Sequence, residues 1–205
     1  DALVRPGRKL LTGTVIGFSP DLSATIREHG THGHRTVEIE ADGDLYEILD
    51  RVGHTPLPPY IHRPDRPDDR ERYQTVFANE RGSVAAPTAS LHFTPEVLTQ
   101  CRDTGAGFAT VTLHVGLGTF ESLHSDQVEA NKLHSEFYRV PQATVDLIRA
   151  SERVVGLGTT AVRALESASL GGQLEAASGE TDIFIYPGFQ FRTVNAMLTN
   201  FHLPK

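Results

Sequence analysis

Four histidines stand where the chain could carry out acid–base chemistry. His92, His114, His134 and His202 each lie beside an expected strand end or turn, and side chains from such places converge in the sites of α/β proteins. Imidazole changes charge near neutral pH, so it can accept or donate a proton during a reaction. Each of these histidines, taken alone, also fits a structural role. We predict that at least one of the four is functional.

A glycine motif, Val-Gly-Leu-Gly-Thr, occurs at 115–119 and again at 155–159. The second copy is expected to join a strand to a helix, where free backbone N–H groups favour an anion. Thr159 or Thr160 would cap the helix or contact the ligand, and a plain tight turn explains the same residues equally well. Only part of a Gly-x-Gly-x-x-Gly fingerprint is present, so we do not expect dinucleotide binding. The candidate ligand-binding residues of the two copies are Gly116, Gly118, Gly156, Gly158, Thr159 and Thr160.

The stretch 71–94 has neither a helical nor an alternating apolar period after Gly82. A segment of this kind is typical of a shaped loop, and shaped loops carry sites. Arginines are frequent in and before it, but aspartates and glutamates lie between them. An RNA contact and a solvated face of mixed charge both remain open.

Composition excludes several classes of protein. The net charge of −7 argues against nonspecific coating of nucleic acid. The sequence has no run of about 18 apolar residues, its first six residues lack the basic and apolar regions of a signal peptide, and it has a single cysteine. We therefore expect a cytoplasmic protein without a membrane span. It also lacks a P-loop, a Cys-x-x-Cys pair, a His-Glu-x-x-His motif and a Gly-x-Ser-x-Gly elbow. We therefore predict no metal site, although a histidine cluster at 29–34 leaves that alternative open.

The element pattern changes once along the chain. Residues 1–52 are rich in expected strands, at 11–18, 22–28 and 35–41, followed by a helix at 44–52 with Asp44 as its N-cap and Gly53 as its stop. Residues 53–69 form a proline-rich connector. Residues 70–205 alternate between helix and strand, which is typical of an α/β domain with a mixed, largely parallel sheet. The expected strands there are 108–115, 153–157 and 182–185, and the expected helices are 95–105, 141–151, 160–170 and 194–198. Because the sequence starts without methionine and ends at Lys205, we expect a longer protein at both ends.

Taken together, these stretches resemble the S-adenosylmethionine:tRNA ribosyltransferase-isomerases of queuosine biosynthesis. The resemblance covers nearly the whole chain, and its ordered succession of motifs is more specific than any one of them. The densest parts are 56–61, 71–78, 82–94, 112–120, 134–136, 158–160, 163–166, 183–188 and 199–205.

The resemblance implies an α/β catalytic domain at 70–205 that carries a smaller inserted β-barrel-like domain, of which residues 1–52 are a part. It also implies an enzyme that moves and isomerises the ribosyl group of S-adenosylmethionine. The acceptor is 7-aminomethyl-7-deazaguanine at the wobble position of tRNA, and the products are epoxyqueuosine, adenine and methionine. S-adenosylmethionine is then a co-substrate, no separate cofactor is needed, and tRNA is the partner of a monomer.

The chemistry implied by the resemblance suggests roles for the candidate residues. His92 and His114 are assigned proton transfer, with Glu136 and His202 in reserve. The turn at 156–160 would hold the methionine carboxylate. RNA contacts are assigned to Arg72 and Arg81 for phosphates and to Tyr73 and Phe93 for base stacking. Two alternatives stay open: a noncatalytic RNA-binding module, and a hydrolase of S-adenosylmethionine or another nucleoside.

Overall fold

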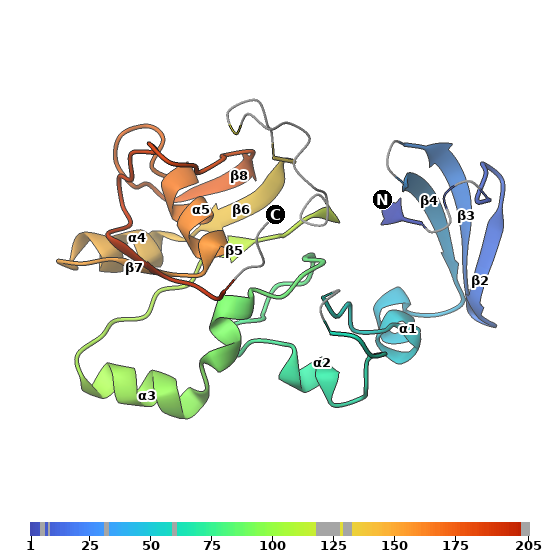
Figure 1. The fold of residues 1–205 in the computed structure, drawn as a ribbon, viewed down its shortest axis with the longest axis horizontal. Coiled ribbons are helices and arrows are strands. Elements are labelled where there is room, and N and C mark those ends of the chain that lie inside the picture. Colours follow the sequence, from blue (N-terminus) through green and yellow to red (C-terminus); the bar gives the residue numbers. More distant parts are fainter. Residues whose placement is uncertain are drawn as a thin grey trace. The chain divides into compact units, whose positions relative to one another are not determined.

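The structure is a computed structural model that describes residues 1–4, 7, 9–30, 33–58, 61–117, 128 and 133–201 (Figure 1). The chain divides into two compact units, Asp1–Thr55 and Pro56–Lys205. Each unit has buried side chains of its own. The expected domains and connector, 1–52, 53–69 and 70–205, remain a prediction, as does the idea that the first is part of an inserted barrel.

The first unit is built on an antiparallel sheet in the order β1-β4-β3-β2. Its strands are β1 (Ala2–Leu3), β2 (Val15–Ser19), β3 (Leu22–His29) and β4 (His34–Ala41). Strand β3 buries Leu22, Ala24 and Ile26 on one face, as alternation along a strand requires. Strand β2 begins later than the expected start at residue 11, because Gly13 has a positive φ of 87° and residues 11–14 form a turn.

The helix of this unit, α1 (Leu45–Val52), confirms the caps expected from sequence. The Asp44 carboxylate accepts the backbone N–H of Glu47 at 3.0 Å, and the Gly53 N–H donates to the carbonyl of Leu49. The helix also contributes buried Ile48. Local side-chain chemistry is sufficient to set both of its ends.

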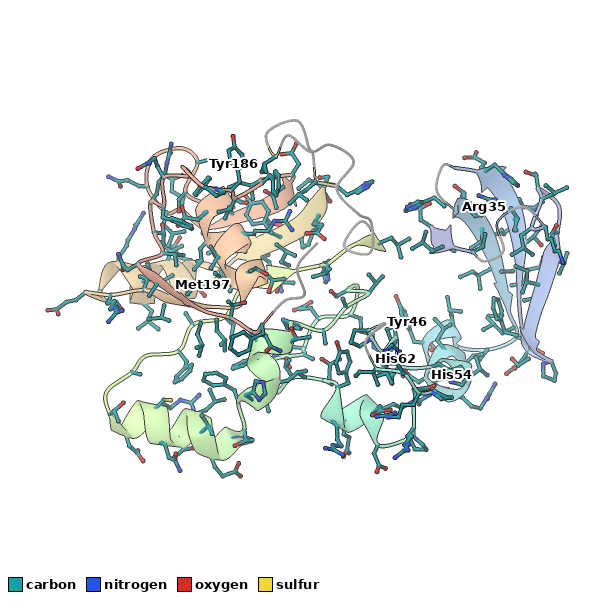
Figure 2. The ribbon with its side chains drawn as sticks, in the orientation of Figure 1. Arg35, Tyr46, His54, His62, Tyr186 and Met197 are labelled. Carbon is teal, nitrogen blue, oxygen red and sulfur yellow. The ribbon has the colours of Figure 1, made fainter. Side chains whose placement is uncertain are left out.

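A buried arginine organises the loops at the end of this sheet. Arg35, in β4, is 5% exposed, and its position beside the strands is visible in Figure 2. Its guanidinium donates to the carbonyls of His34 at 2.7 Å and Gly7 at 2.8 Å, with longer contacts to those of Gly30 and Leu10. A planar fork of donors is suited to such a set of carbonyls.

The proline-rich segment is anchored by one carboxylate. Asp69 lies at the start of α2 (Asp69–Arg72). Its carboxylate accepts hydrogen bonds from both terminal nitrogens of Arg63, at 2.6 and 2.8 Å, and from the backbone N–H of Arg66, at 2.7 Å. The hydrogen-bonded Arg63 guanidinium lowers the pKa of Asp69 from 3.8 to about 2, against the opposing effect of burial.

The second unit combines short sheets with helices. The 3-10 helix η1 covers Thr88–His92, and the other helices are α3 (Pro95–Asp103), α4 (Gln142–Arg149) and α5 (Thr159–Ser167). Strands β5 (Thr112–Leu113), β6 (Glu136–Val140) and β8 (Ala177–Thr181) form an antiparallel sheet, whereas β7 (Val155–Leu157) and β9 (Ala196–Leu198) pair in parallel. The described pairings are therefore mixed, and a largely parallel sheet for the whole domain remains a prediction.

Helix α5 lies against the antiparallel sheet (Figure 1) and carries much of the core of this unit. Val162, Ala164 and Leu165 are buried on it and pack with Val140 of β6 and Val145 of α4. The predicted cap of α3 is confirmed, since the Thr94 hydroxyl accepts the N–H of Val97 and Pro95 opens the helix.

Two expected elements are wrong. Residues 182–185 form no strand, because β6, the partner of β8, begins at Glu136 opposite Thr181, and the Thr181 hydroxyl accepts the N–H of Ile183. Residues 194–198 form no helix, since 196–198 pair with β7. A short apolar run does not distinguish helix from strand, so a partner distant in sequence decided both cases. The expected strand 108–115 is also much shorter, at Thr112–Leu113.

Candidate active site

The imidazole of His114 is held by groups from two other segments. A side chain at Gly82, whose φ is +136°, would place its Cβ 2.8 Å from Nδ1 of His114, so only glycine allows this approach. The imidazole also stacks on Phe137 of β6, with ring centroids 5.4 Å apart and an interplanar angle of 23°. The backbone N–H of His114 donates to the carbonyl of Phe137 at 2.9 Å.

The turn after His114 is fixed by two side chains. The Ser83 hydroxyl accepts the N–H of Val115 at 2.9 Å, and a carboxylate oxygen of Glu136 accepts the N–H of Gly116 at 2.8 Å. The N–H of Val84 in turn donates to the Val115 carbonyl at 3.0 Å. Consecutive backbone donors are thus held by residues that are far away in sequence, and the turn has a defined conformation.

Glu136 also forms an ion pair with Arg163 of α5. The carboxylate side chain is 7% exposed and the arginine side chain is 15% exposed, so water screens the pair weakly. The Nε of Arg163 donates to the carbonyl of Ile183 at 3.2 Å. Its Nη2 is buried and has no hydrogen-bond partner within the part of the chain that the structure describes.

The second glycine turn lies against the same loop that contacts His114. A Cβ on Gly158 would lie 3.4 Å from Cβ of Ala89 in η1, and Gly158 has a φ of +87°. The Gly158 N–H donates to Leu198 of β9 at 2.8 Å. A Cβ on Gly156 would lie 2.6 Å from the Val162 side chain, so this glycine allows strand β7 to pack on α5.

The structure therefore brings several of the predicted segments together. Loop 82–92 contacts the His114 turn at its beginning and the Gly158 turn at its middle, and Glu136 joins the His114 turn to α5. Their proposed catalytic and ligand-binding roles stay predictions. These contacts all lie within the second unit.

The remaining predicted residues have plainer surroundings. His92 ends η1 and is exposed, and Phe93 follows it with a partly buried side chain. The expected helix cap at Thr159 or Thr160 is wrong, because both residues lie within α5 and the N-cap is Gly158, which has no side chain to accept a hydrogen bond. Arg72 and Arg81 are exposed, Tyr73 is partly buried, and Gly118 and His202 lie outside the described residues.

Two residues of this cluster, Ser83 and Arg163, were assigned no role from sequence. Ser83 is an ordinary loop serine with no distinguishing pattern. Arg163 did offer a signal, because a charged residue lies between apolar neighbours on a helix that must be buried, and buried arginines are nearly always paired. Its partner was not predictable, because the partner lies on a strand 27 residues earlier.

A family model described as "Queuosine biosynthesis protein" matches residues 1–205. The chain belongs to this family. It is 61% identical over 204 residues to the S-adenosylmethionine:tRNA ribosyltransferase-isomerase of Solibacter usitatus, covering 100% of this chain and 57% of the relative. It is 46% identical to the enzyme of the same name from Francisella tularensis subsp. tularensis (strain WY96-3418), covering 98% and 60%. The chain thus spans less than two thirds of these queuosine biosynthesis proteins.

A solved structure is also similar to this member of the queuosine biosynthesis family. The S-adenosylmethionine tRNA ribosyltransferase of Thermotoga maritima is 32% identical, with a TM-score of 0.45, covering 99% of this chain and 55% of that one.

Among the described residues, no helix is long and apolar enough to cross a membrane. In the same residues, His, Cys, Asp and Glu form no group of three or more that could hold a metal ion.

Proposed function

We propose that this chain provides catalytic and binding residues of an S-adenosylmethionine:tRNA ribosyltransferase-isomerase. The reaction would transfer and isomerise the ribosyl group onto the aminomethyl nitrogen of 7-aminomethyl-7-deazaguanine at the tRNA wobble position. The proposed products are epoxyqueuosine in the tRNA, adenine and methionine. Membership of the queuosine biosynthesis family and the names of its relatives support this proposal.

The observation that carries the proposal at the level of residues is the convergence on His114. Its imidazole contacts Gly82 and Phe137, and the turn behind it is fixed by Ser83 and Glu136. An immobilised imidazole suits general acid–base catalysis, which depends on the position of the proton acceptor as much as on its pKa.

The reaction requires a base, an acid and a site for a carboxylate. A base must remove an acidic proton next to the sulfonium, and an acid must protonate adenine as its bond to the ribosyl carbon breaks. Methionine leaves with the electron pair of its carbon–sulfur bond, and the aminomethyl nitrogen loses a proton as it forms its bond to the ribosyl group. We assign the two proton transfers to His92 and His114, and the carboxylate to the turn at 156–160.

The proposed RNA contacts lie on both sides of loop 82–92 in the sequence. Arg72 and Arg81 are exposed, as residues that meet phosphates must be, and Tyr73 and Phe93 are partly buried aromatic rings. A wobble base must leave its stack to be modified, and an aromatic ring is a suitable platform for it or for adenine.

The test uses the protein at its full natural length with labelled S-adenosylmethionine. Label that enters tRNA only when the deazaguanine base is present supports the proposal. Release of adenine without RNA favours a nucleoside hydrolase, and tight RNA binding with neither product favours a noncatalytic RNA-binding module.

Replacing His92 or His114 by alanine should lower kcat by roughly 100-fold or more. If both variants keep full turnover, this assignment of the proton transfers is wrong.

A further inference from the structure

We propose that Arg163 is a positioning residue that acts through Glu136 on the His114 turn. The inference rests on the proposed function, because it concerns the same site, and it assigns Glu136 a different task from the proton transfer expected from sequence. Arg163 belongs to α5, Glu136 opens β6, and the turn follows β5. Three separate elements are therefore coupled by a single carboxylate.

The two oxygens of Glu136 have different partners. One accepts the N–H of Gly116 at 2.8 Å, and the other accepts Nη1 of Arg163. A carboxylate with a donor on each oxygen is placed to orient those donors and has less freedom to take up a proton from a substrate. Glu136 therefore holds the backbone two residues after His114, and Arg163 holds Glu136.

Burial makes this coupling strong. Arg163 and Glu136 are only 15% and 7% exposed, and removing either charge would leave the other one buried and unpaired. An unpaired Glu136 would be free to rotate toward other donors or water and to release the Gly116 N–H. The His114 backbone, fixed on one side by Phe137, would then lose a constraint on its other side.

A lysine could not reproduce all the contacts of Arg163. Its guanidinium donates from Nη1 to Glu136 and from Nε to the carbonyl of Ile183, in two directions of one rigid plane. Lysine can supply the charge to Glu136 but has a single nitrogen. Arg163→Lys therefore keeps the ion pair with Glu136 and removes the contact with the carbonyl of Ile183.

The buried Nη2 of Arg163 defines the competing role. It has no acceptor among the described residues, and buried donors are rarely left in that state. If a substrate oxygen is its partner, Arg163 contacts substrate directly. Direct contact and positioning through Glu136 make opposite predictions for the double variant described next.

The experiment compares Arg163→Lys, Arg163→Met, Glu136→Gln and the double variant Glu136→Gln/Arg163→Met in the full-length protein. Arg139→Met is the matched control, because Arg139 lies on β6, the strand of Glu136, and also pairs with a glutamate, Glu80, but on the surface, with side-chain exposures of 45% and 52%. The measurements are kcat, KM for S-adenosylmethionine, the melting temperature and the ¹⁵N resonances of the His114 imidazole.

Positioning predicts that Arg163→Met and Glu136→Gln each lower kcat by roughly 10- to 100-fold, with KM changed less than about threefold. The double variant should be no worse than the poorer single variant, because both changes break one pathway. Arg163→Lys should recover part of kcat. The His114 resonances should shift in both single variants, and Arg139→Met should leave all values near wild type.

Four outcomes overturn the inference. Losses that multiply in the double variant, or an increase confined to KM in Arg163→Met, indicate direct contact with substrate. Unchanged His114 resonances indicate that no coupling exists. Losses of kcat that only follow the melting temperature indicate a structural role. The ¹⁵N resonances can be measured without turnover. An inactive wild type would therefore contradict the proposed function, but the coupling between Arg163 and the His114 turn would still be tested. If Arg163→Met fails to fold, Glu136→Gln and Arg163→Lys test the coupling instead.

Discussion

At the scale of single residues, the candidate site depends on glycines that have no side chain as much as on residues with functional groups. Gly82 allows backbone to approach the His114 ring, and Gly156 allows β7 to approach Val162. Neither position has room for a Cβ without movement of its neighbour. A side chain can therefore be oriented by a residue that offers no functional group.

Replacing Gly82 by alanine should displace the His114 imidazole, because the new Cβ would lie 2.8 Å from its Nδ1. We expect kcat to fall by roughly 10- to 100-fold, as is typical of small misplacements at a reacting group. Gly105→Ala is the control: Gly105 also has a positive φ, +91°, but nothing lies within 4 Å of its Cβ. Equal loss of activity in the two variants would show that backbone strain alone is responsible.

Asp69 should make stability depend on pH in the acid range. Its pKa is about 2 in the folded chain, below the usual 3.8, because of Arg63. The stabilisation is therefore complete above about pH 5 and is lost as the pH falls through the range between these two pKa values. Thermal unfolding should show Asp69→Asn destabilised at neutral pH, with the gap to wild type narrowing below about pH 4. The exposed Asp68 supplies the control variant Asp68→Asn, and a gap that stays constant contradicts this origin of the stability.

At the scale of elements, helix α5 makes three different sets of contacts. Arg163 faces the Glu136 pair, and Val162 and Leu165 enter the core. One turn from Arg163, Glu166 is 1% exposed, and its carboxylate accepts three successive N–H groups, those of Arg192, Thr193 and Val194. Those bonds fix the chain just before β9, which pairs with β7 next to the Gly158 turn.

Replacing Glu166 by glutamine should destabilise the second unit by about 2–4 kcal/mol, since one acceptor oxygen and the charge are lost opposite buried N–H groups. The free energy of unfolding in urea measures this change. The matched control is Glu152→Gln, at an exposed position, which should change stability by less than about 0.5 kcal/mol. A neutral Glu166→Gln variant would mean that the three contacts contribute little to stability.

At the scale of the whole molecule, each compact unit has its own buried polar anchor. Arg35 holds loop carbonyls in the first unit, and Glu166 holds backbone N–H groups in the second. Compact units with separate cores commonly unfold as separate cooperative transitions.

Arg35→Met should therefore lower the free energy of unfolding of the first unit by roughly 3 kcal/mol, because several buried carbonyls lose a charged donor. Hydrogen exchange followed residue by residue in the full-length protein measures this effect, with Glu166→Gln as the reciprocal variant. Amides of β3 should lose protection only in the first variant and amides of α5 only in the second. Loss of protection throughout the chain in either variant would show a single cooperative transition instead.

Sequence was most successful where one residue acts on its immediate neighbours. The caps Asp44 and Thr94 were predicted because capping is a bond across three residues. The strand at 177–181 and the strand at 196–198 were missed, since each exists only through a partner strand far along the chain. The same limit applies to the site: His114 and Gly158 were singled out from local motifs, whereas Ser83 and Arg163 matter through distant contacts.

The sequence by itself determined the family, the order of its motifs, the caps of α1 and α3 and the residue types available for proton transfer. The caps depend on residues three positions apart, and the family is read from the order of motifs along the chain, so neither needs contacts in space. Only the tertiary structure decided that Gly82 meets His114, that Glu136 is held between Gly116 and Arg163, and which short apolar runs are strands. The physical reason is that burial and pairing are set by the whole fold, so the partner of a buried charge or a strand edge cannot be read from its neighbours in the chain.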